Sequence, residues 1–397
     1  MTYEELAHGI AEIVPPNGLK AKLVTAAKEK RPLVVKCGFD PTAPDLHIGH
    51  AVVFRKLRQF QEAGHQVTII IGDATSLIGD PTGRNSMRPP LTPEEIKANA
   101  QTYFDQVGKV LDLKHTKIHY NSEWLNKLDF AGMIKLAAQA TAAQILQRED
   151  FANRMAEDVP VSLHELLYPL VQAYDSFAIK ADIEFGGTDQ LFNNLMGRHL
   201  QERWGQEGQI VMVVPLLRGL DGNDKMSKSK NNYIGITEAP ETMYGKAMSI
   251  PDSLLEEWTH LATDWLDNER KAHLADIKAK PMDVKKAIAY NIVRQYHGAD
   301  AAEVAAQHFY NNVQNRDLAA KDYERKTLSE LGLGAIATPT LLDLCKALMP
   351  ETSNSDLKRL IAQGGVAIDG KPANDAQMEV PAPVKIKIGK RGFFEVV

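Results

Sequence analysis

The chain has 397 residues, too many for one ordinary hydrophobic core, so we expect two or three domains. Its composition is that of an ordinary soluble protein, and a formal net charge of −5 excludes a protein that coats nucleic acid through bulk positive charge. No apolar run approaches the roughly 18 residues of a membrane span, and the N-terminus lacks the apolar stretch of a signal peptide. The only cysteines, Cys37 and Cys345, predict no disulfide framework and indicate a reducing, cytoplasmic compartment without membrane contact.

The first strong pattern is a strand, a tight loop and a helix. An apolar run from Val34 leads into Cys37 and Asp40, and an amphipathic helix opens with His47-Ile48-Gly49-His50 and stops at Gly64. Unpaired N–H groups at a helix start suit phosphate, histidines add donors, and a glycine lets a flat ring approach. The pattern predicts a nucleotide triphosphate site. Surface histidines are the alternative, whereas a metal site is disfavoured because no Cys-x-x-Cys or HExxH pattern supplies further ligands.

A second buried strand, Gln66–Gly72, runs into a glycine-punctuated loop that contains Asp80. Strand, helix, strand with continuous apolar strands predicts a parallel, doubly wound sheet that binds ligands at the carboxyl ends of its strands. Neither a dinucleotide fingerprint nor a P-loop is present. Asp80 could receive an ammonium group or could be an ordinary turn aspartate. Residues 90–160 look mainly helical, an insertion between the halves of the sheet in which nothing suggests chemistry.

A polar helical face follows the insertion. Tyr168, Gln172 and Asp175 recur at helical spacing within a strongly apolar segment, which predicts a buried polar pocket. The next strand-like stretch, 183–190, contains Gly187, where a ligand could approach the backbone. Asp189, which follows this glycine pair, could accept from ribose hydroxyls or simply cap a helix.

A polar loop with glycines, 218–232, follows the strand-like run 209–217 and carries Lys225-Met226-Ser227-Lys228-Ser229. Two lysines three residues apart with small hydroxyls between them suit a mobile phosphate clamp, although such a loop is usually a solvated surface. Helical patterns then continue, and residues 319–335 read as a linker. The tail from residue 338 predicts a helix pair and closing strands.

The letters HIGH at His47–His50 and KMSKS at Lys225–Ser229 match the two signatures of class I aminoacyl-tRNA synthetases. HIGH-like tetrapeptides also occur in small nucleotidyltransferases, but both motifs in this order are specific. Most of the chain resembles the bacterial tyrosyl-tRNA synthetase family, and its tail resembles an S4-type domain. The implied fold is α/β: a Rossmann-like catalytic domain over residues 1–232 with a helical insertion at about 90–160, a helical domain over 233–330, and a small α+β S4-like RNA-binding domain over 336–397.

The resemblance also implies a reaction and its residues. Tyrosine and ATP would form tyrosyl-adenylate, and the tyrosyl group would pass to tRNA(Tyr). ATP would come with Mg²⁺, no tightly bound cofactor is expected, and the enzyme would be a homodimer. The implied catalytic residues are Thr42, His47, His50, Lys225 and Lys228. The implied ATP-binding residues are Cys37, Asp40, Gly49, Gly187, Asp189 and Ser229. The implied tyrosine-binding residues are Asp80, Tyr168, Gln172, Asp175 and Gln190. The implied RNA-binding residues are Lys358, Arg359 and Lys371.

One position departs from the family pattern. Many relatives carry a tyrosine just before the Cys-Gly-Phe-Asp run as a second partner of the substrate phenol, and this chain has Lys36. Three alternatives remain: a tryptophanyl-tRNA synthetase, which shares both motifs but typically lacks the S4-like tail; a non-catalytic RNA-binding protein with a synthetase-like body; and a small nucleotidyltransferase, disfavoured by the tail and the length.

Overall fold

The computed structural model describes residues 2–41, 45–80, 92–311, 323–336, 338–389 and 392–397. The chain folds into two compact units, Met1–Gln307 and His308–Val397, and each is described by itself. A finer division of the first unit at residue 232 stays a prediction.

The first unit is built on a mixed sheet. Within the described residues it has six strands in the order β1-β6-β5-β2-β3-β4. The strands are β1 (Glu12–Val14), β2 (Val34–Phe39), β3 (Gln66–Ile71), β4 (Thr116–Tyr120), β5 (Ile183–Gly187) and β6 (Ile210–Val214). Strands β2 to β6 pair in parallel, and β1 pairs antiparallel with β6 at one edge. The predicted doubly wound sheet is therefore confirmed, with one antiparallel edge strand added.

The strand order reverses direction at the middle of the sheet. From β2 the chain moves outward through β3 to β4, and it then returns to lay down β5 on the other side of β2. Ligands of such sheets bind where the order reverses, at the carboxyl ends of the strands. The junction of β2 and β5 is therefore the expected position of the site.

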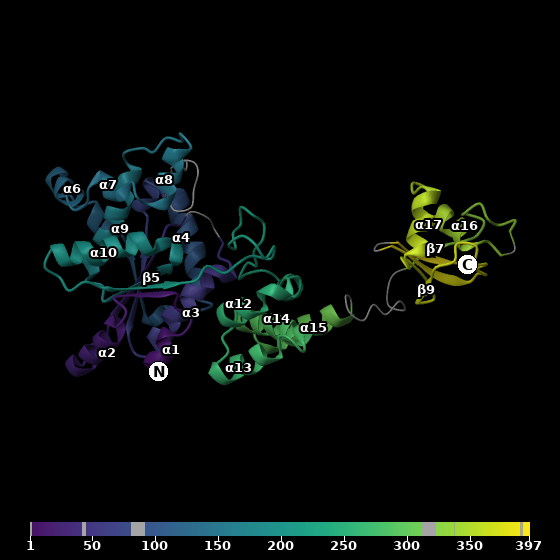
Figure 1. Ribbon diagram of the computed structural model, residues 1–397, viewed down its shortest axis with the longest axis horizontal. Helices are drawn as coiled ribbons and strands as arrows, with labels where there is room; N and C mark the ends of the chain where they lie inside the picture. The colour runs from purple at the N-terminus through teal and green to yellow at the C-terminus, as the bar shows by residue number, and fades with distance from the viewer. Residues whose placement is uncertain (1, 42–44, 81–91, 312–322, 337, 390–391) are drawn as a thin grey trace. The chain divides into compact units, whose positions relative to one another are not determined.

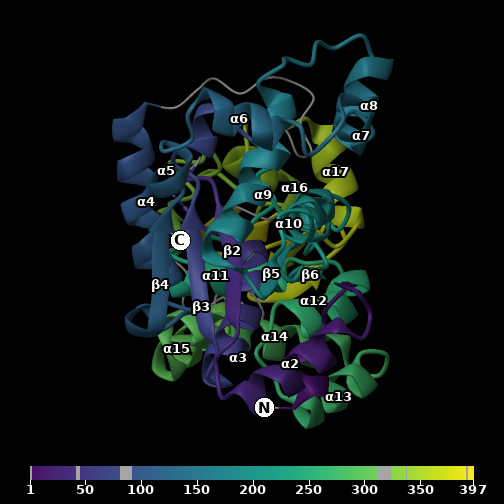
Figure 2. The same ribbon diagram turned by 90° about the vertical axis from the view of Figure 1, so that its left-hand side faces the viewer.

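Helices cover both faces of this sheet, which explains why β3 and β6 are almost wholly apolar and buried. In Figure 1, α9 and α10 lie on one side of the sheet and α2 and α3 on the other; Figure 2 gives the view turned by 90°. The helices are α1 (Tyr3–Ala7), α2 (Gly18–Glu29), α3 (Ile48–Glu62), α4 (Pro93–Val107), α5 (Ser122–Leu125), α6 (Phe130–Ala137), α7 (Ala142–Ile145), α8 (Glu149–Ala156), α9 (Tyr168–Ile179) and α10 (Leu191–Arg203).

The insertion after β3 differs from its prediction. It is mainly helical, but it also contributes β4, which pairs in parallel with β3 along Val67–Ile71 and forms the other edge of the sheet. The strand was missed because its sequence, TKIHY, is short and half polar, as suits an edge strand with partly exposed side chains.

The chain turns helical after the loop 218–232. The helices there are α11 (Pro240–Met248), α12 (Leu255–Leu261), α13 (Asp267–Asp276), α14 (Pro281–His297) and α15 (Ala299–Phe309). On α14, the apolar side chains of Val284, Ile288 and Ile292 recur one turn apart and are buried, and the helix ends at Gly298, whose φ is near 86°. Over the residues that the structure describes, no helix combines the length and apolar character needed to cross a membrane.

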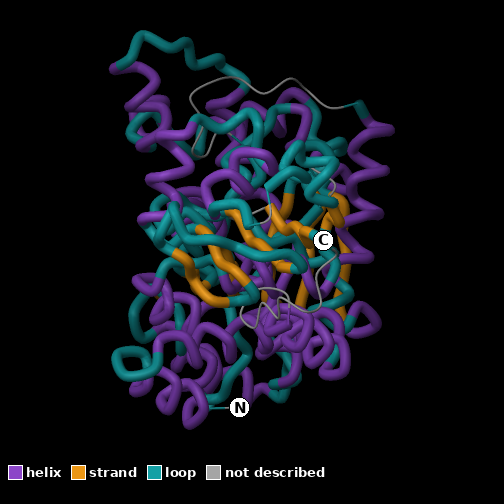
Figure 3. The backbone as a smooth tube through the Cα atoms, turned by 90° about the vertical axis from the view of Figure 1, so that its right-hand side faces the viewer, coloured by secondary structure: helices purple, strands orange, loops and turns teal. Residues whose placement is uncertain are grey.

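The C-terminal unit is a small sheet with two helices (Figures 1 and 3; strands are orange in Figure 3). Its described strands follow the order β7-β11-β10-β8-β9. The elements are β7 (Glu324–Lys326), α16 (Leu341–Leu348), α17 (Asn354–Ala362), β8 (Val366–Ile368), β9 (Lys371–Ala373), β10 (Val384–Ile388) and β11 (Gly392–Val396). Leucines of α16 and α17 pack on the inner face of the sheet as one core. The predicted linker is too long, since β7 pairs with β11 and belongs to this unit.

Candidate active site

A cavity of about 800 Å³ opens at the carboxyl ends of β2 and β5, where the strand order reverses. It gathers residues from Cys37 to Lys230, which lie 193 positions apart in the sequence. Of the residues predicted to act on nucleotide or tyrosine, fourteen line this cavity: Cys37, Asp40, His47, Gly49, His50, Asp80, Tyr168, Gln172, Asp175, Gly187, Asp189, Gln190, Lys225 and Ser229. Lys228 does not line it, and Thr42 lies outside the described residues.

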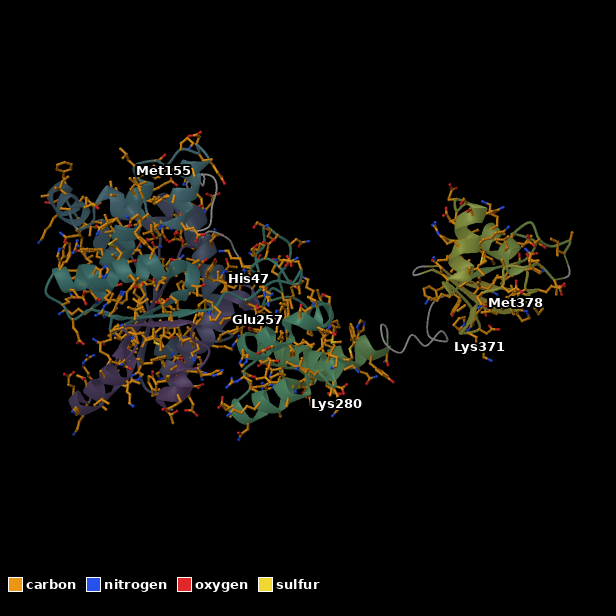
Figure 4. All side chains as sticks on the ribbon, viewed as in Figure 1. His47, Met155, Glu257, Lys280, Lys371 and Met378 are labelled. Atoms are coloured by element: carbon orange, nitrogen blue, oxygen red, sulfur yellow. The ribbon has the colours of Figure 1, made fainter. Side chains whose placement is uncertain are left out.

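The two motifs meet beside this cavity through backbone pairing. The N–H of Ile48 donates to the carbonyl of Ile234 at 3.0 Å, and the N–H of Ile236 donates to the carbonyl of Leu46 at 3.1 Å. These bonds tie the start of α3 to the segment that follows the KMSKS loop. His47, at the first turn of α3, is labelled in Figure 4. The sequence predicted each motif, and the fold alone brings them together.

Gly49 is needed because the ring of His47 lies over it. A Cβ at Gly49 would fall 2.9 Å from His47 Nδ1 and 3.5 Å from the Cβ of Met226, in the second motif. No side chain fits between these groups without displacing the imidazole. The glycine is thus required for close packing of the two motifs, as well as for the open backbone that the sequence suggested.

Both imidazoles are neutral near pH 7. Burial, together with the positive charge of Lys228, lowers the pKa of His47 to about 2 and that of His50 to about 4. The backbone N–H of His47 donates to His50 Nδ1 at 3.2 Å, so the neutral ring of His50 carries its proton on Nε2. His50 therefore presents a hydrogen-bond donor without a full charge. Among the described residues, no group bonds the buried Nδ1 of His47.

The two lysines of the second motif are held by carboxylates. Lys225 Nζ lies 2.9 Å from the carboxylate of Asp189. Lys228 Nζ lies 3.1 Å from the carboxylate of Asp45, which lies between β2 and α3. Both ammonium groups are partly exposed, so these pairs contribute little to stability and can be exchanged for other anions at low cost.

The far wall of the cavity carries a carboxylate network. The Tyr168 hydroxyl donates to Asp40 Oδ2 at 2.9 Å, and the Thr75 hydroxyl donates to Asp40 Oδ1 at 2.8 Å. Gln190 Nε2 donates to Asp80 Oδ2 at 3.0 Å. Burial, with the charge of Asp40, raises the pKa of Tyr168 well above its usual value, so its hydroxyl stays protonated as a donor.

Asp175 lies at the closed end of the cavity and is held by residues that the sequence reading missed. Trp124 Nε1 donates to Asp175 Oδ1 at 2.8 Å, and Asn121 Nδ2 lies 3.4 Å from Oδ2. Both partners follow β4 in the insertion, where nothing had suggested chemistry. The only available signal was that polar residues end a strand of a parallel sheet. Burial raises the pKa of Asp175 to about 7, and the charge of Lys36 opposes this shift.

Arg148 is a second contribution from the insertion. It is buried, its Nη2 lies 4.0 Å from Asp80 Oδ1, and its guanidinium is paired with Asp150 at 3.0 Å and donates to Asn193 Oδ1 at 2.8 Å. The guanidinium thus places a positive charge beside the Asp80 carboxylate at the cavity wall.

Lys36 does not reach the cavity. Its side chain is fully buried, and its ammonium group is paired with Glu184 at 2.9 Å. The three residues predicted to bind RNA are Lys358 and Arg359 on α17 and Lys371 on β9 (Figure 4 labels Lys371); all are exposed, and Arg359 is paired with Asp356. Among the described residues, no group of three or more His, Cys, Asp or Glu side chains is placed to hold a metal ion.

A doubly wound sheet whose switch point carries HIGH and KMSKS motifs around one cavity is the catalytic architecture of a class I aminoacyl-tRNA synthetase. The family model of class I tRNA synthetases (W and Y) matches residues 28–314. The chain belongs to this family, and within it to the tyrosine–tRNA ligases, as its relatives indicate.

Two relatives are similar over nearly their whole length. Tyrosine–tRNA ligase 2 of Photorhabdus laumondii is 50% identical over 99% of this chain and 98% of that protein. Tyrosine–tRNA ligase of Moorella thermoacetica is 49% identical over 98% and 94%. Solved structures support the fold: a truncated mitochondrial tyrosyl-tRNA synthetase of Aspergillus nidulans (TM-score 0.62, 24% identity, 79% of this chain and 92% of that chain) and the enzyme of Archaeoglobus fulgidus complexed with L-tyrosine (TM-score 0.62, 23%, 76% and 98%). The tryptophanyl and non-catalytic alternatives are not favoured.

Proposed function

We propose that this chain activates L-tyrosine with ATP, giving tyrosyl-adenylate and pyrophosphate, and then transfers the tyrosyl group to the terminal ribose of tRNA(Tyr). The observation that carries this proposal is that residues of both motifs line one cavity together with the buried polar side chains of Tyr168 and Asp175. The carboxylate of tyrosine attacks the α-phosphate of ATP in line. No covalent enzyme intermediate forms, so positioning and charge stabilisation supply the catalysis.

The nucleotide end of the cavity is assigned to the two motifs. His47 and His50 donate to the phosphates from one side, with Thr42 as a third group implied by the family resemblance. Lys225 and Lys228 leave Asp189 and Asp45 and approach the phosphates from the other side, where charge develops in the transition state. Asp189 is then free to accept from the ribose. Cys37, Asp40, Gly49, Gly187 and Ser229 complete the adenosine and phosphate surface.

The closed end of the cavity is assigned to the amino acid. Asp80, with Tyr168, Gln172 and Gln190, receives the ammonium group, and Asp175 accepts from the phenol hydroxyl. The bonds from Trp124 and Asn121 hold the Asp175 carboxylate in place for this contact. Phenylalanine lacks this hydroxyl, so the buried Asp175 carboxylate would receive no hydrogen bond from it, and its binding is disfavoured.

The deciding experiment is ATP–pyrophosphate exchange with tyrosine, tryptophan and phenylalanine in parallel. The expected result is exchange with tyrosine at a kcat/KM far above that with phenylalanine, and no exchange with tryptophan. Exchange with tryptophan would refute the pocket assignment, and no exchange with any of them would refute the enzymatic proposal.

The remaining partners follow from the same proposal. ATP enters with its own Mg²⁺, and no step depends on a metal held by the protein. The C-terminal unit binds tRNA(Tyr) through Lys358, Arg359 and Lys371. We place the protein in the cytoplasm, which is consistent with two buried cysteines that form no disulfide.

A homodimer is supported by apolar side chains on the insertion. Phe130 and Ile134 lie one turn apart on α6 and are 83% and 56% exposed, and Leu163, just after the insertion, is 82% exposed. A second copy would cover them. Phe130→Glu should convert the dimer to a monomer in sedimentation velocity, whereas Leu266→Glu, at an equally exposed leucine on the helical segment after the sheet, should leave the dimer intact. An unchanged sedimentation coefficient for Phe130→Glu would contradict this assignment.

A further inference from the structure

A buried ion pair lies beneath the closed end of the cavity. Lys36 on β2 and Glu184 on β5 are neighbours in register on adjacent parallel strands, and their side chains are 0% and 1% exposed. Glu184 lines the cavity, whereas Lys36 lies behind it. Burying two charges costs several kcal/mol, and apolar residues of similar volume are often as stable. The pair is therefore poorly explained by stability alone.

Every donor of the Lys36 ammonium is used by the protein. Nζ donates to Glu184 Oε1 at 2.9 Å, to Ser176 Oγ at 2.8 Å and to the carbonyl of Gln172 at 3.4 Å. No N–H is left for a ligand, so Lys36 is not a direct partner of the substrate hydroxyl. Its effect must pass through the groups that it holds.

Those groups belong to α9, the helix that forms the wall of the pocket. Lys36 binds the backbone of Gln172 and the side chain of Ser176, and Asp175 lies between these two positions on the helix. Glu184 in turn lies 3.4 Å from Gln172 Nε2 and 2.9 Å from Ser176 Oγ. The ion pair thus fastens the turn of α9 that carries both Gln172 and Asp175 to the central strands.

We propose that Lys36, paired with Glu184, is a positioning residue that sets the preference of the pocket for a ring with a hydroxyl group over a bare ring. This inference rests on the proposed function. It replaces the direct phenol contact that the sequence resemblance suggested for position 36 with an indirect one, in which a cation behind the pocket wall fixes the acceptor Asp175 and the neighbouring Gln172.

The electrostatics act in the same direction. The charged or titratable groups that face Asp175 are Lys36 on β2, Glu184 on β5 and Tyr168 on its own helix. The charge of Lys36 lowers the pKa of Asp175, and that of Glu184 raises it. Loss of Lys36 alone therefore favours protonated Asp175, and loss of Glu184 opposes this change only in part, because Lys36 has the larger effect on Asp175.

The test compares Lys36→Met with the parent enzyme in tyrosine- and phenylalanine-dependent pyrophosphate exchange. The kcat/KM for tyrosine should fall about tenfold or more through KM, while kcat/KM for phenylalanine and KM for ATP change less than about twofold. The acid limb of the tyrosine profile should also move to higher pH. If tyrosine and phenylalanine fall together, or if their ratio holds within about twofold, the proposal is wrong.

Two further variants keep the test decisive. Lys36→Met/Glu184→Gln leaves no unpaired buried charge, so it should fold even if the single variant does not. It should lose selectivity, and its acid limb should move less than that of Lys36→Met. Selectivity equal to the parent would overturn the proposal. Lys22→Met is the matched control: Lys22 is buried and paired with Asp182 and Glu207 at the amino ends of the strands, away from the cavity, so it should lower stability with the ratio unchanged. Failure of the proposed function is distinguishable, because the parent would then show no tyrosine-dependent exchange.

Discussion

Asp175 is a buried side chain that can carry a charge, and its burial opposes its ionisation. A carboxylate at the closed end of a cavity loses its hydration, and burial therefore raises its pKa to about 7. The bonds from Trp124 and Asn121 and the charge of Lys36 recover part of this cost by favouring the ionised form. Asp175 is thus a hydrogen-bond acceptor whose burial lowers the stability of the folded chain, as expected of a residue in a binding site.

The raised pKa of Asp175 predicts that the stability of the protein depends on pH. The pKa of Asp175 is about 7 in the folded chain and close to 4 in the unfolded chain, so between these values the folded state binds a proton that the unfolded state does not. Stability therefore falls as pH rises from 4 to 7. Asp175→Asn lacks this loss, and its free energy of unfolding relative to the parent should rise by roughly 2–3 kcal/mol between pH 5 and 7.5. Denaturant titrations at the two pH values measure it; a difference independent of pH would contradict the assignment.

Lys228 gives a second prediction at this scale. In the ligand-free chain it is paired with Asp45 outside the cavity, so its proposed role requires it to move to the phosphates. Lys228→Ala should lower kcat of pyrophosphate exchange on the order of 100-fold and leave the tyrosine Kd within about twofold. Asp45→Asn removes only the ligand-free partner and should keep kcat within about threefold. Equal losses of exchange and tyrosine binding in Lys228→Ala would show that the lysine does not act on phosphate.

At the scale of elements, the site depends on how the start of α3 packs against the loop that carries KMSKS. Periodicity predicted α9, because Tyr168, Gln172 and Asp175 recur at helical spacing within a strongly apolar segment. It missed β4, whose five residues are half polar, and with it Asn121 and Trp124, which β4 delivers to Asp175. β4 is stabilised by its pairing with β3, and this interaction cannot be predicted from the residues of β4 alone.

Gly49 tests this packing. Gly49→Ala would place a methyl group 2.9 Å from His47 Nδ1, so the imidazole must shift, and exchange should fall roughly tenfold or more. Gly245→Ala is the matched control, a helical glycine in α11 with nothing within 4 Å of the added carbon. It should keep full activity and gain up to about 1 kcal/mol of stability. Full exchange by Gly49→Ala would show that close packing of the two motifs is not required.

At the scale of the whole molecule, each of the two compact units has its own proposed role: the first activates tyrosine, and the second binds tRNA. The cavity and every described residue assigned to the first reaction step lie in residues 1–307, whereas the C-terminal unit has its own core and sheet. The unit begins earlier than residue 336, because β7 joins its sheet by pairing with β11. A truncation that removes the C-terminal unit should therefore end before residue 308.

The chain 1–307 should catalyse tyrosine-dependent pyrophosphate exchange within about threefold of the full chain, because its core is self-contained. Charging of tRNA(Tyr) should be abolished, since the predicted RNA-binding residues are removed. Exchange and aminoacylation measured on the same preparations separate the two steps. Full charging by the truncated chain would show that the C-terminal unit does not anchor the RNA.

The sequence by itself determined the family, the doubly wound sheet and most of the site, because HIGH, KMSKS and the helical spacing of Tyr168, Gln172 and Asp175 are local patterns. Tertiary structure alone decided the partners. It paired the two lysines with Asp45 and Asp189, brought Asn121 and Trp124 to Asp175, and turned Lys36 away from the cavity toward Glu184. The reason is physical: spacing along the chain sets which face a side chain takes, whereas the neighbour it meets there depends on strand register and helix packing between distant segments.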